Sequence, residues 1–257
     1  MTLDRPTVFL AGTAGAGKSS LTAALREWFG EQSLDSLIVN LDPGADRLPY
    51  EPEVDIRDWV RLDELMAEMG LGPNGAQVAA ADLIAVNLGE VIEACAAAKP
   101  DVYLVDTPGQ LELFAFRASG PYVVSALTSM PYLAFLMDPI VSKEPRGLVA
   151  QLLLAATVHF RLQVPTVNVI SKCDLLPQTI QDQVLQWVQD HDTLMDAVEN
   201  EPITLASQLN VSIARTLADF AGIARTVATS ARTSEGLGDI YNAVLETYAG
   251  GEKEIPR

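Results

Sequence analysis

A glycine-rich segment near the N-terminus carries the clearest chemical pattern of the chain. Residues 12–19 have the sequence Gly-Thr-Ala-Gly-Ala-Gly-Lys-Ser and match G-x-x-x-x-G-K-[ST] at every position. Glycines let the backbone curl so that successive N–H groups face phosphate oxygens. Lys18 can then reach the β- and γ-phosphates, and the Ser19 hydroxyl can ligate Mg²⁺. We therefore predict a site for a nucleoside triphosphate and Mg²⁺. Its phosphate-binding residues are Gly12, Thr13, Ala14, Gly15, Ala16, Gly17, Lys18, Ser19 and Ser20.

Two aspartates follow apolar runs and add to this chemistry. Asp106 ends a run of four largely apolar residues and precedes Thr-Pro-Gly-Gln, a pattern in which the aspartate holds Mg²⁺. Gln110 is placed to orient an attacking water. Glu112 is either a solvated residue at a helix start or a second carboxylate that positions this water. Asp42, in Asn-Leu-Asp-Pro-Gly, is either close to the phosphates or only the start of a turn before proline.

Two later segments carry residues that could read a base. Ser171-Lys172-Cys173-Asp174 stands where GTPases commonly have N-K-x-D, with serine in place of asparagine. The Asp174 carboxylate would accept hydrogen bonds from N1–H and the exocyclic amine of guanine. Adenine lacks this pair of donors, so the carboxylate would stay unpaired against it. The alkyl stem of Lys172 would lie along the base. Ser230 and Ala231, in Thr-Ser-Ala after the last apolar run, would bring a backbone N–H to guanine O6. Taken alone, Lys172 and Asp174 are also compatible with an ion pair on a loop, although this pattern favours a base reader.

Short β-branched runs alternate with longer helical stretches, and this order predicts an α/β fold with a mostly parallel sheet covered on both faces. The predicted strands cover residues 7–11, 37–41, 102–105, 132–137, 166–170 and 226–228. The predicted helices cover residues 18–29, 76–98, 146–161, 178–198, 209–221 and 237–248. Residues 43–52 are rich in turn-forming residues, and residues 250–257 are predicted to fray.

Composition narrows the class of protein. The net charge is −17 and the pI about 4.4, which disfavours direct binding of nucleic acid or anionic lipid. Cys95 and Cys173 form neither a disulfide framework nor a metal cluster, as expected of free thiols in a reducing cytoplasm. No apolar stretch reaches the length of a membrane span. We expect a cytoplasmic protein.

These motifs occur together with Asp-Ile-Arg-Asp at residues 55–58 and Gly72-Pro73-Asn74-Gly75. In this order and spacing, the chain resembles a GPN-loop GTPase from about residue 8 to about residue 248. The resemblance implies the three-layer α/β/α fold of P-loop NTPases. It implies one GTPase domain over residues 1–257, with a GPN-loop segment at about 43–76 and a helical insertion at about 177–221.

The resemblance also implies how such a protein works. Members of this family are homodimers or close heterodimers, and the resemblance implies a homodimer through the GPN-loop side. Gly72, Pro73 and Asn74 would form a tight loop that enters the nucleotide site of the partner chain. The implied catalytic residues are Lys18, Asp42, Gln110, Glu112 and, from the partner chain, Asn74. Ser19 and Asp106 would hold Mg²⁺, and GTP and GDP would be substrate and product. The implied role is that of an assembly or biogenesis factor that acts on a protein complex, with an unidentified client protein. Independently of the resemblance, we expect the helical residues 178–221 to face this client.

Other functions remain open on the sequence. An ATP-driven maturation or partitioning ATPase of related architecture also places an aspartate after the second strand, although it generally lacks the Ser-Lys-x-Asp reader. A P-loop phosphotransferase would need an acceptor pocket that no motif indicates. A scaffold with a relict site conflicts with the intact Lys18, Ser19, Asp106 and Gln110. No residue is marked as an arginine finger, and Arg47, Arg57 and Arg117 are near motifs only.

Overall fold

The fold is organised around one parallel sheet that brings the predicted motifs to the same edge. The computed structural model describes residues 2–200, 205–218 and 224–248. All strand pairs in the sheet are parallel, and the strand order is β3-β2-β4-β1-β5-β6-β7. The strands are β1 (Thr7–Gly12), β2 (Ser36–Asn40), β3 (Val54–Asp55), β4 (Val102–Asp106), β5 (Pro131–Met137), β6 (Thr166–Ile170) and β7 (Thr226–Ala228).

The register of the central strands aligns their carboxyl ends. Asp106, the last residue of β4, pairs with Leu10 of β1 on one side and with Asn40 of β2 on the other. Gly12, the last residue of β1, pairs with Leu136 of β5. The loops after β1, β2 and β4 therefore start at one level, where ligands of open parallel sheets bind.

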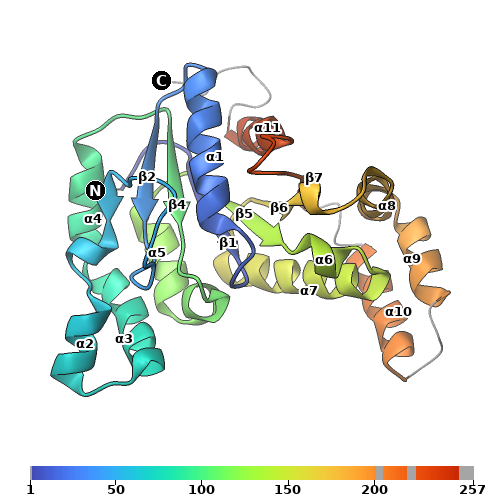
Figure 1. The fold of residues 1–257 in the computed structure, drawn as a ribbon, viewed down its shortest axis with the longest axis horizontal. Helices are drawn as coiled ribbons and strands as arrows, with labels where there is room; N and C mark the ends of the chain where they lie inside the picture. The colour runs from blue at the N-terminus through green and yellow to red at the C-terminus, as the bar shows by residue number, and fades with distance from the viewer. Residues whose placement is uncertain (1, 201–204, 219–223, 249–257) are drawn as a thin grey trace.

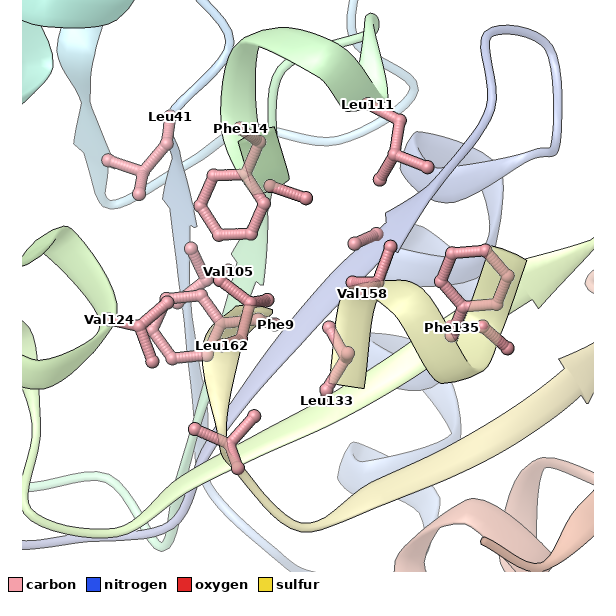
Figure 2. Close-up of a cluster of buried hydrophobic side chains, with 14 of the residues drawn as sticks. Phe9, Leu41, Val105, Leu111, Phe114, Val124, Leu133, Phe135, Val158 and Leu162 are labelled. Atoms are coloured by element: carbon pink, nitrogen blue, oxygen red, sulfur yellow. The ribbon is translucent and has the colours of Figure 1, made fainter. Parts of the chain in front are cut away.

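Helices cover both faces of the sheet, as Figure 1 shows. On one face, α1 (Lys18–Glu31) and α11 (Leu237–Tyr248) pack against the strands through side chains such as Leu25 and Ile240. The other face carries a larger core, part of which is drawn in Figure 2, where Phe9 and Phe135 of the strands meet Phe114 and Val158 of the helical layer. This arrangement confirms the three-layer α/β/α prediction.

The remaining helices lie on the second face of the sheet or connect its strands. They are α2 (Leu62–Met69), α3 (Pro73–Val86), α4 (Leu88–Ala96), α5 (Ser119–Leu127), α6 (Pro139–Ser142), α7 (Pro145–Leu162), α8 (Gln178–Gln189), α9 (His191–Glu199) and α10 (Leu205–Ala218). Short helical segments are η1 (Ile56–Asp58), the π-helical η2 (Glu112–Phe116) and η3 (Cys173–Leu175). In the sequence, the helices α8, α9 and α10 connect β6 to β7. In space, α10 packs against α7 and α9. None of the helices among the described residues combines the length and apolarity that a membrane crossing demands.

The structure corrects several predicted boundaries. The edge strand β3 was not predicted, because two residues are too few to show a periodic pattern. The helix predicted for 76–98 is divided into α3 and α4 at Asn87, whose side-chain amide donates to the carbonyl of Leu83. The helix predicted for 178–198 is divided at Asp190, whose carboxylate accepts from the N–H of Asp192 and caps α9. Of the helix predicted for 209–221, α10 ends at Ala218; the rest, like the tail 250–257, lies outside the described residues.

Candidate functional site

The loop between β1 and α1 has the backbone shape that phosphate binding requires. Gly15 and Gly17 adopt φ angles of 77° and 98°, a region that favours glycine. A Cβ atom at Gly12 would lie 2.6 Å from the carbonyl oxygen of Leu136, so only glycine allows β1 to turn this close to β5. Helix α1 begins at Lys18 with no side chain capping its first N–H groups. These N–H groups therefore face the loop as free donors for an anion.

Lys18 lies at the centre of this loop. Its side chain is only 6% exposed. Its Nζ donates to the carbonyl oxygens of Gly12, Thr13 and Gly109 at 3.0, 3.2 and 3.2 Å. Burial lowers the pKa of Lys18, and the nearby carboxylates of Asp106 and Asp42 oppose this shift. Lys18 therefore joins the loop after β1 to the loop after β4 and is the buried cation of the site.

Asp42 lies against the same loop after β4. Its carboxylate accepts from the N–H of Gly109 at 2.8 Å and from the N–H of Gly44 at 2.9 Å. Burial raises the pKa of Asp42, while these two hydrogen bonds and Lys18 oppose the rise. Asp42 thus has features of both interpretations. Its carboxylate stabilises the turn at Gly44, as in a turn before proline, and it also reaches the loop after β4 through the Gly109 N–H. An anion that approached the Gly109 N–H would have to compete with this carboxylate.

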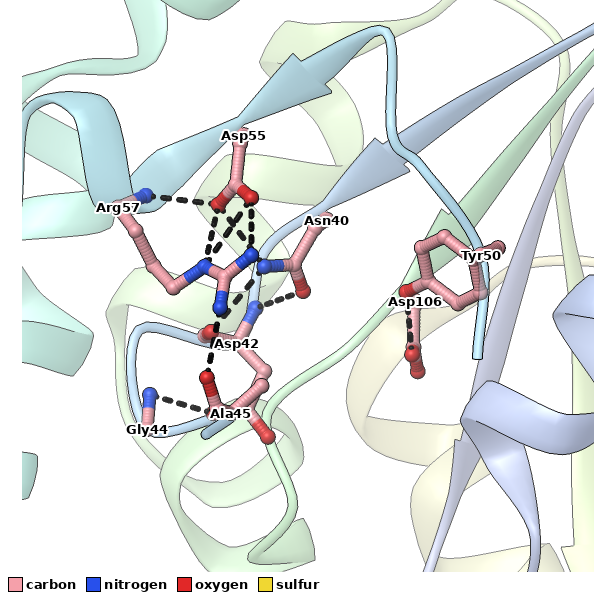
Figure 3. Close-up of polar contacts among 8 residues, drawn as sticks. All are labelled: Asn40, Asp42, Gly44, Ala45, Tyr50, Asp55, Arg57 and Asp106. Atoms are coloured by element: carbon pink, nitrogen blue, oxygen red, sulfur yellow. Dashed lines mark hydrogen bonds and ion pairs between the residues drawn. The ribbon is translucent and has the colours of Figure 1, made fainter. Parts of the chain in front are cut away.

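Asp106 is 1% exposed and faces both Ser19 and Tyr50. The Tyr50 hydroxyl donates to Asp106 Oδ2 at 2.6 Å (Figure 3), whereas Oδ1 is buried without a hydrogen-bond partner among the described residues. Burial raises the pKa of Asp106, and the neighbouring hydroxyls of Ser19 and Tyr50 act against this rise. A buried carboxylate oxygen left without a partner beside a serine hydroxyl fits Mg²⁺, which binds oxygen ligands and completes its shell with water and substrate phosphates.

A polar network fixes the end of β2 beneath this site. Asn40 accepts from the N–H of Asp42 at 3.0 Å and donates to Asp55 Oδ1 at 2.9 Å. Asp55 in turn binds the Arg57 guanidinium, which also donates to the carbonyl of Ala45 at 2.8 Å (Figure 3). Burial acts to raise the pKa of Asp55, but the hydrogen bonds from Arg57 and Asn40 outweigh it, and the pKa lies below its usual value. The network holds the Asp42 turn in place.

The arginines near the motifs have structural partners. Arg57 is occupied by Asp55, and Arg117 pairs with Asp82 of α3. Arg47 is exposed. Each of the two paired arginines is thus engaged by a carboxylate of its own chain.

The predicted base-reading residues meet at the other end of the phosphate loop. The Ser171 hydroxyl is within hydrogen-bond distance of the Ala16 carbonyl, at 2.7 Å, and Lys172 Nζ donates to the Gly15 carbonyl at 2.5 Å. The stem of Lys172 lies over Gly17, where an added Cβ would be 3.0 Å from the lysine Cε. Ser171 therefore ties the base-reading loop to the phosphate loop, although it replaces the usual asparagine.

Asp174 and Ser230 are also brought together. The Ser230 hydroxyl donates to Asp174 Oδ1 at 2.6 Å and accepts from the N–H groups of Arg232 and Thr233. The backbone N–H of Cys173 donates to the Thr229 carbonyl at 2.9 Å, so the two predicted loops are hydrogen-bonded to each other. Asp174 is half-buried and uses one carboxylate oxygen, Oδ1, in its contact with Ser230.

Comparisons with known proteins agree on one family. A family model described as a conserved hypothetical ATP binding protein matches residues 10–250. A GPN-loop GTPase of Pyrococcus abyssi (strain GE5 / Orsay) is 30% identical over 245 residues, which are 94% of this chain and 96% of that protein. The crystal structure of a GTPase in apo form from Pyrococcus abyssi superimposes with a TM-score of 0.85 at 30% identity, over 95% of this chain and 97% of that one.

The chain belongs to the GPN-loop GTPase family. GPN-loop GTPase 1 of Dictyostelium discoideum is also 29% identical over 92% of this chain, which matches 60% of that longer relative. The predicted family, the predicted fold class and the predicted enzyme class, a GTPase, are confirmed.

The Gly-Pro-Asn segment of this family member differs from the tight loop expected of it. Gly72 is the N-cap of α3, and Pro73 and Asn74 form the first turn of that helix. Proline is favoured at the first helical position because its missing N–H would have no partner there. Asn74 is exposed, at the turn between α2 and α3 that Figure 1 shows at the tip of this helical pair, apart from the loop after β1. The fold therefore carries Asn74 away from the phosphate loop of its own chain.

Gln110 and Glu112 both follow β4 in the chain, but their surroundings differ. Gln110 Nε2 donates to Gln77 Oε1 of α3 at 2.7 Å, beside a cavity of about 160 Å³ that Asp42 and Ala14 also line. Glu112 is exposed at the start of the π-helical η2. Gln110 thus lines the same cavity as Ala14 of the phosphate loop, and Glu112 is not among the residues that line it.

Three residues with contacts to the site were missed in the sequence. Tyr50 lies in a turn-rich segment, and Gln77 lies three residues after Asn74 on the same helix. Gln181 of α8 is buried and donates to the carbonyl oxygens of Cys173 and Leu176. These two hydrogen bonds stabilise the loop that carries Asp174. A buried glutamine in a polar helix gives no sequence pattern, since only the fold shows which backbone groups it reaches.

Proposed function

We propose that this protein binds GTP with Mg²⁺ and hydrolyses it as a homodimeric switch. The observation that carries the proposal is the direct bonding between the two ligand-reading loops: Ser171 and Lys172 both contact the backbone of the phosphate loop. A base held at Asp174 is thereby set at a fixed distance from phosphates held at Lys18. The geometry thus matches a whole nucleotide rather than a phosphate alone.

Hydrolysis would proceed by in-line attack of water on the γ-phosphate. Lys18 and the N–H groups at the start of α1 would stabilise the negative charge that develops, at donors already oriented by the fold. The Gly109 N–H would reach the γ-phosphate when the Asp42 carboxylate moves off it, leaving Asp42 free to accept a hydrogen bond from the attacking water. Gln110 and Glu112 would help to orient this water. Mg²⁺, held through Ser19 and Asp106, would supply charge neutralisation between the phosphates.

The homodimer is proposed from the shape of the α2–α3 pair. Within α2, which is described throughout, no side chain is buried, and Met69 is 59% exposed. Val78 of α3 is 39% exposed on the same pair. A helical pair that exposes these two apolar side chains is suited to pack against a second copy. Such a dimer would bring Asn74 to the phosphates of the partner's site.

A mixed dimer tests this arrangement. One chain carries Asn74→Ala and the other Lys18→Ala, co-expressed with different affinity tags and purified through both. If Asn74 acts across the interface, the first chain's site keeps its own Lys18 and receives an intact Asn74, so about half of the wild-type GTP turnover should remain. Homodimers of each variant are the controls. Turnover no higher than in those homodimers would contradict action across the interface.

We further propose that the two nucleotide states differ in the α2–α3 pair and that a client protein recognises one of them. The net charge of −17 supports a protein client over nucleic acid or an anionic membrane. Cys95 and Cys173 are free and buried, which suits the proposed cytoplasmic location.

ATP is the competing nucleotide, because the matching family model is described as ATP binding. Asp174 favours GTP, since adenine offers no pair of donors to a carboxylate at this position. We expect GTP to displace a fluorescent GDP analogue at concentrations at least about 100-fold lower than ATP. The measurement is a competition titration followed by fluorescence anisotropy, with CTP as a control. Equal displacement by ATP and GTP would reject the guanine assignment.

A further inference from the structure

Tyr50 reaches the nucleotide site from a segment that carries no recognised nucleotide motif. It lies between β2 and β3, and its hydroxyl donates to Asp106 Oδ2 at 2.6 Å (Figure 3). Its ring packs against the core formed by β1, α1 and α11. Three residues later, the Glu53 carboxylate accepts from the backbone N–H of Ile38 at 2.8 Å and pairs with Arg26 of α1. The segment that presents the phenol is therefore anchored on both β2 and α1.

The direction of this hydrogen bond follows from the charges around it. An ionised carboxylate has only acceptor oxygens, whereas the Tyr50 phenol carries a proton, so the phenol is the donor. The Asp106 carboxylate is then the acceptor through Oδ2. Its other oxygen, Oδ1, is buried and has no hydrogen-bond partner within the described part of the chain.

We propose that Tyr50 is a positioning residue for the Mg²⁺ site, holding Asp106 Oδ2 so that Oδ1 faces the metal. This inference rests on the proposed Mg²⁺-dependent GTP binding. A carboxylate without a partner on Oδ2 could rotate about its side-chain bonds, and that freedom would have to be lost each time the ion binds. Groups that hydrogen-bond a metal ligand from behind typically change metal affinity by about 10–100-fold when removed.

The test is the variant Tyr50→Phe, which removes the hydroxyl and keeps the ring that packs on the core. Mn²⁺ replaces Mg²⁺ as the probe, because its binding to the GDP-loaded protein is followed by electron paramagnetic resonance without any turnover. We expect Mn²⁺ to bind the variant about 10–100-fold more weakly than the wild type. GDP affinity measured in EDTA should stay within about twofold, since no donor to the nucleotide is lost.

Tyr248→Phe is the matched control, because its hydroxyl donates to the Pro131 carbonyl at the opposite end of β5 from the site. It should bind Mn²⁺ as the wild type does. Unchanged Mn²⁺ affinity in Tyr50→Phe would overturn the role of Tyr50, and tighter binding would also overturn it by showing that the phenol competes with the metal. A wild-type protein that binds GDP but gives no Mn²⁺ signal would instead overturn the metal site itself, and the role of Tyr50 with it.

Discussion

Replacement of Lys18 by methionine should lower the rate of GTP hydrolysis by about 10²–10³-fold, the effect of removing one oriented donor from a transition state. Methionine keeps the length and the apolar stem of the side chain, which is 6% exposed, so packing in α1 should change little. The ammonium is lost, and with it the cation that links the carbonyls of Gly12, Thr13 and Gly109. The measurement is single-turnover hydrolysis at saturating GTP, which separates the chemical step from binding.

The control for this variant is Lys99→Met, which makes the same change on an exposed lysine just before β4, at the amino ends of the strands. It should hydrolyse GTP at the wild-type rate. Thermal unfolding of both variants shows whether the fold is kept, because Asp106 and Asp42 lose a neighbouring positive charge when Lys18 is replaced. A folded Lys18→Met protein with wild-type turnover would remove Lys18 from the proposed mechanism.

Replacement of Asp174 by asparagine should weaken GTP binding by about 10²–10⁴-fold, because two hydrogen bonds to a charged acceptor are worth about 1.5–3 kcal/mol each. The same variant should bind XTP better than it binds GTP. Xanthine carries a carbonyl where guanine carries the exocyclic amine, and the asparagine amide can donate to it. The measurement is a pair of titrations, GTP and XTP, on wild type and variant. Ser230 can still donate to the amide oxygen at position 174, so the loop should keep its shape.

Asp182→Asn is the matched control, with the same loss of charge on α8, where the exposed carboxylate accepts from Gln178. It should keep the wild-type preference for GTP over XTP. An Asp174→Asn protein that bound GTP and XTP as the wild type does would show that Asp174 does not contact the base.

Most of the fold followed from local patterns. Six of the strands were predicted because strands buried on both faces are continuous apolar runs, and the motifs come directly after them. The strand β3 was missed because two residues are too few to show a periodic pattern. The division between α3 and α4 was missed because the single Asn87 does not interrupt the apolar pattern. The start of α3 at Pro73 was also missed, because Gly-Pro-Asn-Gly has the composition of a turn.

The site was predicted in part for the same reason. Lys18, Ser19, Asp106 and Asp174 belong to contiguous motifs whose chemistry requires those residue types at that spacing. Tyr50 and Gln77 act through side chains that meet groups far away in sequence, Asp106 and Gln110. Gln181 reaches carbonyl groups of the nearby loop before α8, which its own position in a polar helix does not indicate.

The sequence alone determined the ligand chemistry of this protein, because a phosphate loop and a base reader are short segments whose backbone and side chains act within a few residues of one another. Only the tertiary structure decided how these segments are held. The parallel register brings Asp106 beside β1 and β2, Ser171 and Lys172 join the two ligand-reading loops, and the α2–α3 pair carries Asn74 away from its own site. Those relations join residues that are distant in the chain, and they exist only once the sheet and its helices have packed.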